Sequence, residues 1–340
     1  MITPEDLRAA VQRGIVTEAQ SAQLIALAMT RQTAKDGVAA VEEPFVLFKG
    51  FNEIFVVVGL TILFIGWVGV ATILGLDLDA PGGPTTTVLA GLTILALAGV
   101  GRYFTTRRRM VAPSIALSVM TALTAMVLGF ALLGSPLGID TLAMVSLFVA
   151  LVMTAHYWVF RIPFSAAIIA GAAYYAVFSV WTMRAGDSGM GLTALTILFG
   201  LAVFALAMRL DMSDPLRVST RSATAFWLHV VAAPAIVNTV ALRLLADGSA
   251  AAQTGLLAFL LLIAVVAVVI DRRSFLISGA GYSVALAATL FDGGAAIAIL
   301  ILGLALVLLG AGWDRLRARL MMALPDFPGK SNLPAYGVTA

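Results

Sequence analysis

The chain consists of long apolar blocks joined by short polar connections. Ten blocks have roughly the length, about 18 to 25 residues, that an α-helix needs to cross a hydrocarbon core of about 30 Å. They do not alternate apolar with polar positions, as the strands of a membrane β-barrel do. The pattern predicts ten transmembrane helices at residues 51–75, 85–104, 111–133, 141–160, 164–182, 192–210, 226–245, 255–270, 275–291 and 295–313.

The composition agrees with a membrane protein. Of the 340 residues, 61% are hydrophobic and 11% are charged, whereas soluble domains carry about 25% charged residues. We therefore expect an all-α, polytopic integral membrane protein, and a water-soluble monomer is excluded. The sequence contains no cysteine, which removes disulfides, thiolate catalysis and thiolate metal sites as possibilities.

The basic residues predict the orientation. With the N-terminus inside, all of the 21 lysines and arginines except Arg184 and Arg243 fall on one side, as the positive-inside rule requires. Both termini are then cytoplasmic, in the inner membrane of a bacterium. A nine- or eleven-span arrangement would place the basic cluster at residues 315–319 outside. The pI near 9.4 reflects these cytoplasmic loops, so no nucleic-acid partner is expected.

The odd-numbered spans from the third onward begin alike, with a basic residue followed by small and β-branched residues. The arginines at these starts, Arg109, Arg161, Arg221 and Arg273, are 52, 60 and 52 residues apart. This spacing is consistent with a series of two-helix hairpins. Any antiparallel membrane bundle would give a similar pattern, so both interpretations stay open.

The N-terminal segment is too polar to cross a membrane. Residues 1–35 predict a cytoplasmic helical hairpin, in which Gly14 ends the first helix and Thr17 caps the second. Gln20, three residues after Thr17, completes a capping box. Residues 36–50 predict a linker to the membrane domain.

The membrane domain, residues 51–313, is followed by a basic segment, residues 314–340. Its first part predicts an amphipathic helix that continues from the last span and places Leu316, Leu320 and Leu324 on one face. Such a helix suits an anionic cytoplasmic membrane surface. The proline-containing remainder is predicted to be disordered.

The opening of the chain resembles a known group of proteins. A short helix, the segment Gly14-Ile15-Val16-Thr17 and a second helix beginning Glu18-Ala19-Gln20 precede a many-span region with arginine-rich inner loops. This arrangement resembles the bacterial DUF2157-type predicted membrane proteins. The resemblance implies a membrane protein of this class, and it implies no activity.

Four polar residues, Glu53, His156, His229 and Asn238, lie within or just beside the predicted spans. Unpaired ionisable groups are costly there, so each is a candidate functional residue. Together they would line a vestibule on the cytoplasmic side, in which a carboxylate and two imidazoles relay protons or bind a cation. Taken singly, Glu53 pairs with Lys49 at the water boundary, and the histidines belong to an interfacial aromatic belt.

The longest inner loop carries a cluster of opposite charges, to which the next inner loop adds further partners. Two carboxylates and several arginines could clamp a phosphate or a divalent ion. The plainer interpretation is a local salt-bridged turn that begins at residues 213–215. The cluster comprises Asp211, Asp214, Arg217, Arg221, Asp271, Arg272 and Arg273.

No catalytic residue, metal site or cofactor is predicted. The two histidines are 73 residues apart, without the spacing of metal ligands, and no nucleophile elbow or phosphate-binding loop occurs. The best-supported function is a non-enzymatic membrane scaffold or signalling component that docks partners on its cytoplasmic face. Its expected partners are membrane lipids and a protein at the N-terminal hairpin. The alternatives are a transporter of a small or lipidic solute, centred on Asn238, and an intramembrane enzyme.

Overall fold

The computed structural model describes residues 10–11, 13–17, 20, 51–73, 83–133, 138–186, 189–215, 217, 219–290, 295–334 and 336. These residues form helices and no strands, as the all-α class predicts. The apolar helices are α3 (Phe51–Ile73), α4 (Pro84–Gly101), α5 (Val111–Leu133), α6 (Ile139–Phe160), α7 (Ser165–Ala185), α8 (Gly189–Met212), α9 (Thr220–Asp247), α10 (Ala250–Ile270), α11 (Ser274–Leu290) and α12 (Ala295–Ala311). The remaining elements are the π-helical turn η2 (Arg102–Arg107), α13 (Trp313–Ala323) and the 3₁₀ turn η3 (Lys330–Asn332).

Each of the ten predicted spans corresponds to one of the helices α3 to α12. In the described part of the chain, eight helices are long and apolar enough to cross a membrane. The 17 residues of α11 extend about 25 Å, which is short of a hydrocarbon core of about 30 Å. A ninth span results only if α12 and α13 count together, and a bend of 80° separates them. The structure therefore shows eight or nine candidate spans where the sequence predicts ten.

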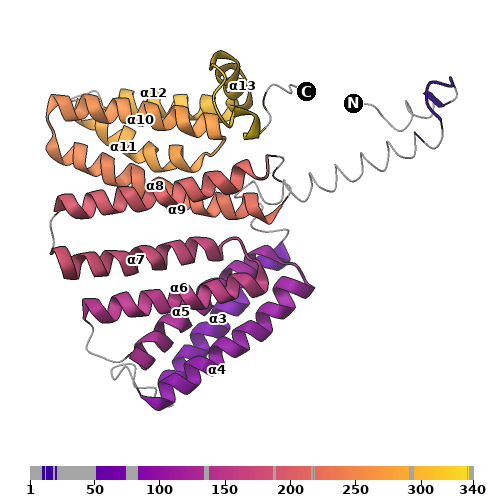
Figure 1. Cartoon of the computed structure of the whole chain (residues 1–340), viewed down its shortest axis with the longest axis vertical. Helices are drawn as coiled ribbons and strands as arrows, with labels where there is room; N and C mark the ends of the chain where they lie inside the picture. Colours follow the sequence, from indigo (N-terminus) through magenta and orange to yellow (C-terminus); the bar gives the residue numbers. More distant parts are fainter. Residues whose placement is uncertain are drawn as a thin grey trace.

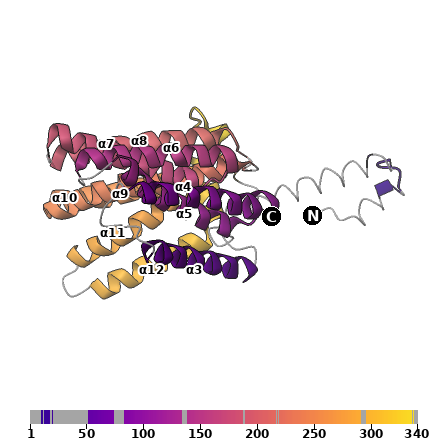
Figure 2. The same ribbon diagram turned by 90° about the horizontal axis from the view of Figure 1, so that it is seen from below.

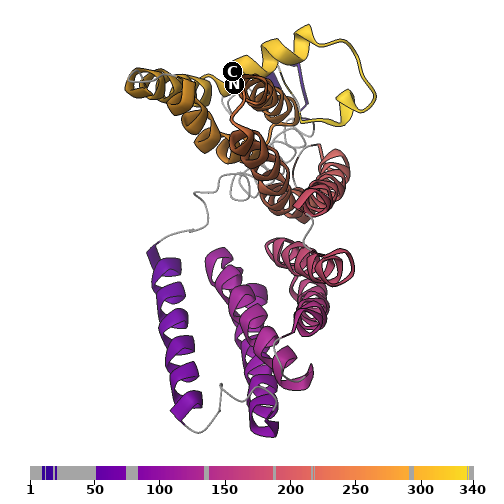
Figure 3. The same ribbon diagram turned by 90° about the vertical axis from the view of Figure 1, so that its left-hand side faces the viewer.

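The apolar helices lie side by side, roughly in chain order from α3 and α4 to α11 and α12 (Figure 1). The row is curved, so that α3 and α12, at its two ends, lie toward the same side (Figures 2 and 3). The two most buried spans are α5 and α9. Helix α5 packs against α3, α4 and α6, while α9 packs against α7, α8, α10 and α11. These two helices are the centres of the two halves of the bundle.

Helix α9 can occupy this central position because its buried face is built from small residues. Ala225, Ala232, Ala233 and Ala241 are fully buried. On α8, a methyl group added to Gly200 would lie 2.8 Å from Cγ1 of Ile236, so the two backbones approach closely there. Small residues allow such approach in membrane bundles, where association depends on van der Waals packing.

The structure supports a repeating two-helix unit. The helices that follow the basic loops, α5, α7, α9 and α11, begin at intervals of about 54 residues. Shortly before each start lies one non-glycine residue with a left-handed backbone, φ between 52° and 58°, namely Arg109, Arg161, Arg217 and Asp271. This conformation is disfavoured for residues with a Cβ atom, so its recurrence in the four turns before these helices supports the repeat.

Only a few residues of the predicted N-terminal hairpin are described. The capping box is confirmed, because the Thr17 N–H donates to Oε1 of Gln20 at 3.0 Å and the Gln20 N–H donates to Oγ1 of Thr17 at 3.2 Å. Gly14 has φ +67°, as expected of a glycine that ends a helix. The rest of the hairpin and the linker at residues 36–50 lie outside the described residues.

The C-terminal segment differs from its prediction. Helix α13 does not continue α12, because the chain bends by 80° at Gly312. Its buried face contains Trp313, Arg317 and Met321, whereas Leu316 is 41% exposed. In the described part of the tail, Nη2 of Arg317 donates to the Pro334 carbonyl at 2.7 Å. A buried guanidinium needs such acceptors, and this requirement holds the tail against α13.

Candidate functional site

The predicted charge cluster lies at the basic end of the bundle. We use this name for the end that carries the α4–α5, α6–α7, α8–α9 and α10–α11 loops together with α13 (Figure 1). Its centre is Asp211 in the last turn of α8, whose side chain is 4% exposed. Nε of Arg272, from the α10–α11 loop, donates to Oδ2 of Asp211 at 2.9 Å, and Nη2 donates to Oδ1. This bidentate geometry is the strongest form of an arginine–carboxylate pair.

His229 of α9 completes the centre. Its Nε2 lies 3.0 Å from Oδ2 of Asp211. An ionised carboxylate only accepts hydrogen bonds, so Nε2 carries the proton and donates it. The imidazole is fully buried, with the rings of Phe204 and Phe275 at centroid distances of 5.5 and 6.0 Å. Nδ1 has no hydrogen-bond partner among the described residues.

Arg272 also binds the start of α9. Its Nη2 donates to the Ser222 carbonyl at 3.3 Å and to Oγ of Ser222 at 3.2 Å. The guanidinium carbon lies 6.0 Å from the centroid of the Phe226 ring, within the range of a cation–π contact. One arginine thus joins the end of α8, the start of α9 and the α10–α11 loop.

A second centre lies at Asp271, the left-handed residue that ends α10. Its Oδ2 accepts from Nη1 of Arg217 at 3.0 Å, and its Oδ1 accepts from the Trp313 indole N–H at 2.6 Å. Nη2 of Arg217 donates to the main-chain carbonyls of Asp271 and Ile270 at 3.1 and 3.4 Å. Nε of Arg317 lies 4.0 Å from Oδ1 of Asp271. This centre attaches α13 to two basic loops.

The other cluster members have different roles. Asp214 is buried and accepts from the N–H and the Oγ of Ser219, the N-cap residue of α9, at 2.8 and 2.6 Å. Arg221 and Arg273 are exposed, and Arg273 lies over the Trp313 ring at 5.3 Å. The predicted local turn at residues 213–215 is present, but the carboxylates at 211 and 271 pair across helices and not within that turn.

The remaining candidates, Glu53, His156 and Asn238, do not join this cluster. Oε2 of Glu53 accepts from the Ala112 N–H at 3.3 Å, at the start of α5, where an unpaired backbone donor favours a carboxylate. Nδ1 of His156 lies 3.2 Å from Oγ of Ser165, across the α6–α7 turn. Asn238 is half-buried in α9. Among the described residues, no hydrogen bond joins any two of the four vestibule candidates Glu53, His156, His229 and Asn238.

We call the cross-helix set Asp211, Arg217, Ser222, His229, Asp271, Arg272 and Trp313 the charge network. Its members lie on α8, α9 and α13 and in the loops between them, and most are less than 10% exposed. Losing one partner of such a buried pair costs about 3–5 kcal/mol, because the other charge is left uncompensated. Asp211 accepts three hydrogen bonds from Arg272 and His229, and the His229 ring lies between Phe204 and Phe275. This arrangement suits holding helices together better than reacting with a substrate.

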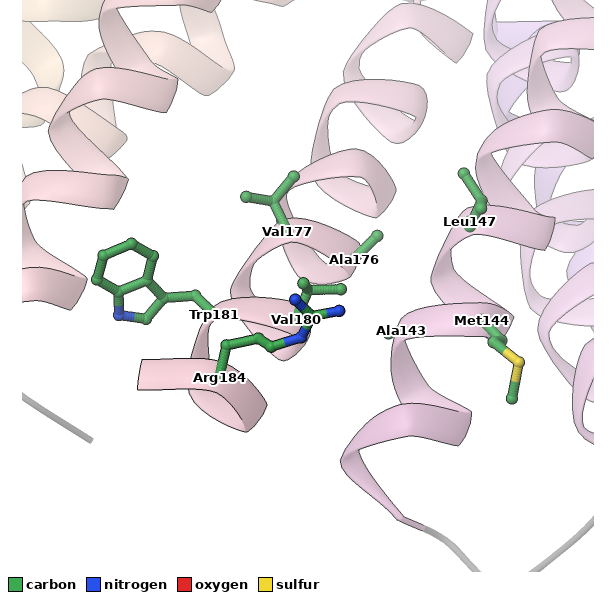
Figure 4. A pocket seen from close by; sticks show the side chains of 8 residues that line it. All are labelled: Ala143, Met144, Leu147, Ala176, Val177, Val180, Trp181 and Arg184. Carbon is green, nitrogen blue, oxygen red and sulfur yellow. The ribbon is translucent and has the colours of Figure 1, made fainter. Parts of the chain in front are cut away.

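Two apolar grooves occur elsewhere, toward the other end of the helices. One, of about 460 Å³, lies between α6 and α7 and includes Arg184 (Figure 4). The second, of about 290 Å³, lies between α3, α4 and α5, where the Trp67 indole N–H donates to Oγ1 of Thr93 at 2.9 Å. Neither groove is lined by Asn238 or by the charge network. Within the described residues, no three histidine or acidic side chains gather as metal ligands.

Comparison with protein-family models, curated proteins and solved structures finds no match to this chain. The DUF2157-type resemblance therefore stays a prediction. The site predicted from the sequence does not include Trp313, Ser222 or Arg317. Trp313 stands at the predicted end of the last span, where tryptophan is enriched at the membrane interface, but this pattern does not indicate a hydrogen bond to Asp271. No sequence pattern indicates that Ser222 or Arg317 belongs to the site.

Proposed function

We propose that this chain is a membrane scaffold of ten spans in a bacterial inner membrane, with both termini in the cytoplasm, and that it binds a protein partner at its basic end. The observation that carries the proposal is the charge network. Its buried charges bind to one another and fix α8, α9, the α10–α11 loop and α13, and neither groove is lined by them. A scaffold needs a rigid face of this kind, whereas a transporter needs polar groups along a path.

The surface around the network supports an acidic partner. The carboxylates of Asp211, Asp214 and Asp271 bind groups within the protein. Five arginines are exposed instead: Arg209, Arg221, Arg273, Arg315 and Arg319. Among the described residues, the exposed carboxylates near α13 are Asp314 and Asp326. The excess of exposed guanidinium groups would attract a protein segment rich in aspartate and glutamate.

The absence of cysteine makes transport directly testable. We expect Asn238→Cys to resist a membrane-impermeant maleimide added from either side of oriented vesicles, because a packed scaffold has no water path to it. Ala323→Cys at α13 should react only from the cytoplasmic side, and Ala250→Cys, exposed at the start of α10, only from the other side. Labelling of Asn238→Cys would show a water-filled route and overturn the scaffold in favour of a transporter.

Partner binding needs a separate test. A reversible cross-linker, applied in cells, should link the wild-type chain to an acidic protein that the charge-reversed variant Arg315→Glu/Arg319→Glu loses. Arg107→Glu/Arg108→Glu makes the same charge change at exposed positions elsewhere on the basic end and should keep it. Deleting residues 1–35 should weaken the complex without affecting insertion. Equal cross-linking in all four chains would contradict the proposal.

A further inference from the structure

The groove between α6 and α7 carries a cation on an apolar surface. Its lining is aliphatic and aromatic, with Leu147 from α6 and Val177 and Val180 from α7, and Arg184 lies in the last turn of α7. Figure 4 shows the Arg184 side chain turned toward α6 beside Val180, while Trp181 points to the other side of α7. A volume of about 460 Å³ is within the range of ligand-binding pockets.

Arg184 differs from the other arginine on this side of the bundle. Nε of Arg243 donates to Oγ1 of Thr193 at 2.9 Å, and its Nη2 donates to the Gly189 carbonyl, so its guanidinium is used within the protein. Arg184 has no hydrogen bond or ion pair to any described residue. A guanidinium at a membrane boundary binds phosphate through paired N–H groups, and apolar walls beside it bind hydrocarbon.

We propose that this groove binds one anionic phospholipid, with the phosphate on Arg184 and an acyl chain along the α6–α7 groove. Charge complementarity selects this occupant, because a zwitterionic lipid offers the same chain without the net negative charge. The site lies at the opposite end of the bundle from the charge network, and it does not depend on the scaffold function.

Native mass spectrometry of the full-length protein in detergent tests the site. With phosphatidylglycerol added, we expect one lipid to remain bound at several-fold lower concentration than with phosphatidylcholine of the same chains. Arg184→Gln should weaken phosphatidylglycerol binding about tenfold, as expected for a lost charge-assisted hydrogen bond, and should leave phosphatidylcholine binding unchanged. Arg243→Gln, the matched loss of an outer arginine, should keep the lipid preference.

A second variant tests the groove itself. Ala176→Phe places a ring in the groove while leaving Arg184 in place, and it should reduce binding of both lipids. The assignment is overturned if phosphatidylcholine binds as tightly as phosphatidylglycerol, or if Arg184→Gln binds phosphatidylglycerol as the wild type does. It is also overturned if the purified chain is a dimer that Ala176→Phe dissociates, because the occupant would then be a second copy of the chain.

Discussion

Asp211→Asn should be among the most destabilising single changes at the basic end. Asp211 and Arg272 are 4% and 5% exposed, so the substitution leaves a guanidinium buried without its counter-charge. The expected loss is about 3–5 kcal/mol of unfolding free energy. The exposed neighbour provides the control: Arg273→Met removes only the contact over Trp313, worth about 0.5–1 kcal/mol.

The assay is unfolding by sodium dodecyl sulfate in mixed micelles, followed by circular dichroism. The double variant Asp211→Asn/Arg272→Met removes both charges, so it should cost about 2 kcal/mol less than the sum of its two single variants. Strict additivity would show that the two side chains do not act as a pair. A cost of Asp211→Asn no larger than that of Arg273→Met would refute the account of the charge network as the clamp of this end.

Three further changes probe the remaining architecture in the same assay. Gly200→Ala should destabilise by about 1–3 kcal/mol, because the added methyl would lie 2.8 Å from Ile236, and an unchanged stability would mean that α8 and α9 are not in close contact. Trp313→Phe keeps the ring but loses the hydrogen bond to Asp271, which should cost about 1.5–3 kcal/mol; a neutral result would place α13 elsewhere. Arg161→Gly should instead stabilise by about 1 kcal/mol, since φ is 54° at this exposed position, and a loss of stability would contradict that backbone geometry.

The helices could be predicted from the sequence because membrane insertion acts on local composition. A block such as residues 111–133 must satisfy its own backbone hydrogen bonds in hydrocarbon, and α5 has those bounds. The bend before α13 was missed, although Gly312 stands at the break. Hydropathy reports how long an apolar run is, and it does not report in which direction the chain leaves the run.

Only part of the membership of the charge network could be predicted, namely Asp211, Arg217, Asp271 and Arg272. The sequence places Asp211 and Arg272 in successive inner loops, but their contact joins residues 61 positions apart and depends on how α8, α9 and α10 pack. His229 shows the same limit. Its neighbour Trp227 suggested an interfacial belt. Trp227 packs against Phe164 of the α6–α7 turn, whereas His229 is fully buried against Asp211. Helix rotation decides between these environments, and no local pattern records it.

The separation of Asp211 and Arg272 in the chain has a consequence for biosynthesis. Asp211 is synthesised 61 residues before its counter-ion, with α9 and α10 still to be made. At about 5–20 residues per second, the carboxylate waits roughly 3 to 12 s for Arg272. During this interval His229 of α9, made 18 residues after Asp211, can reach the carboxylate, but its bidentate partner Arg272 is still missing. Closure of the basic end is therefore a late event, and a ribosome that stops before residue 272 leaves an open bundle.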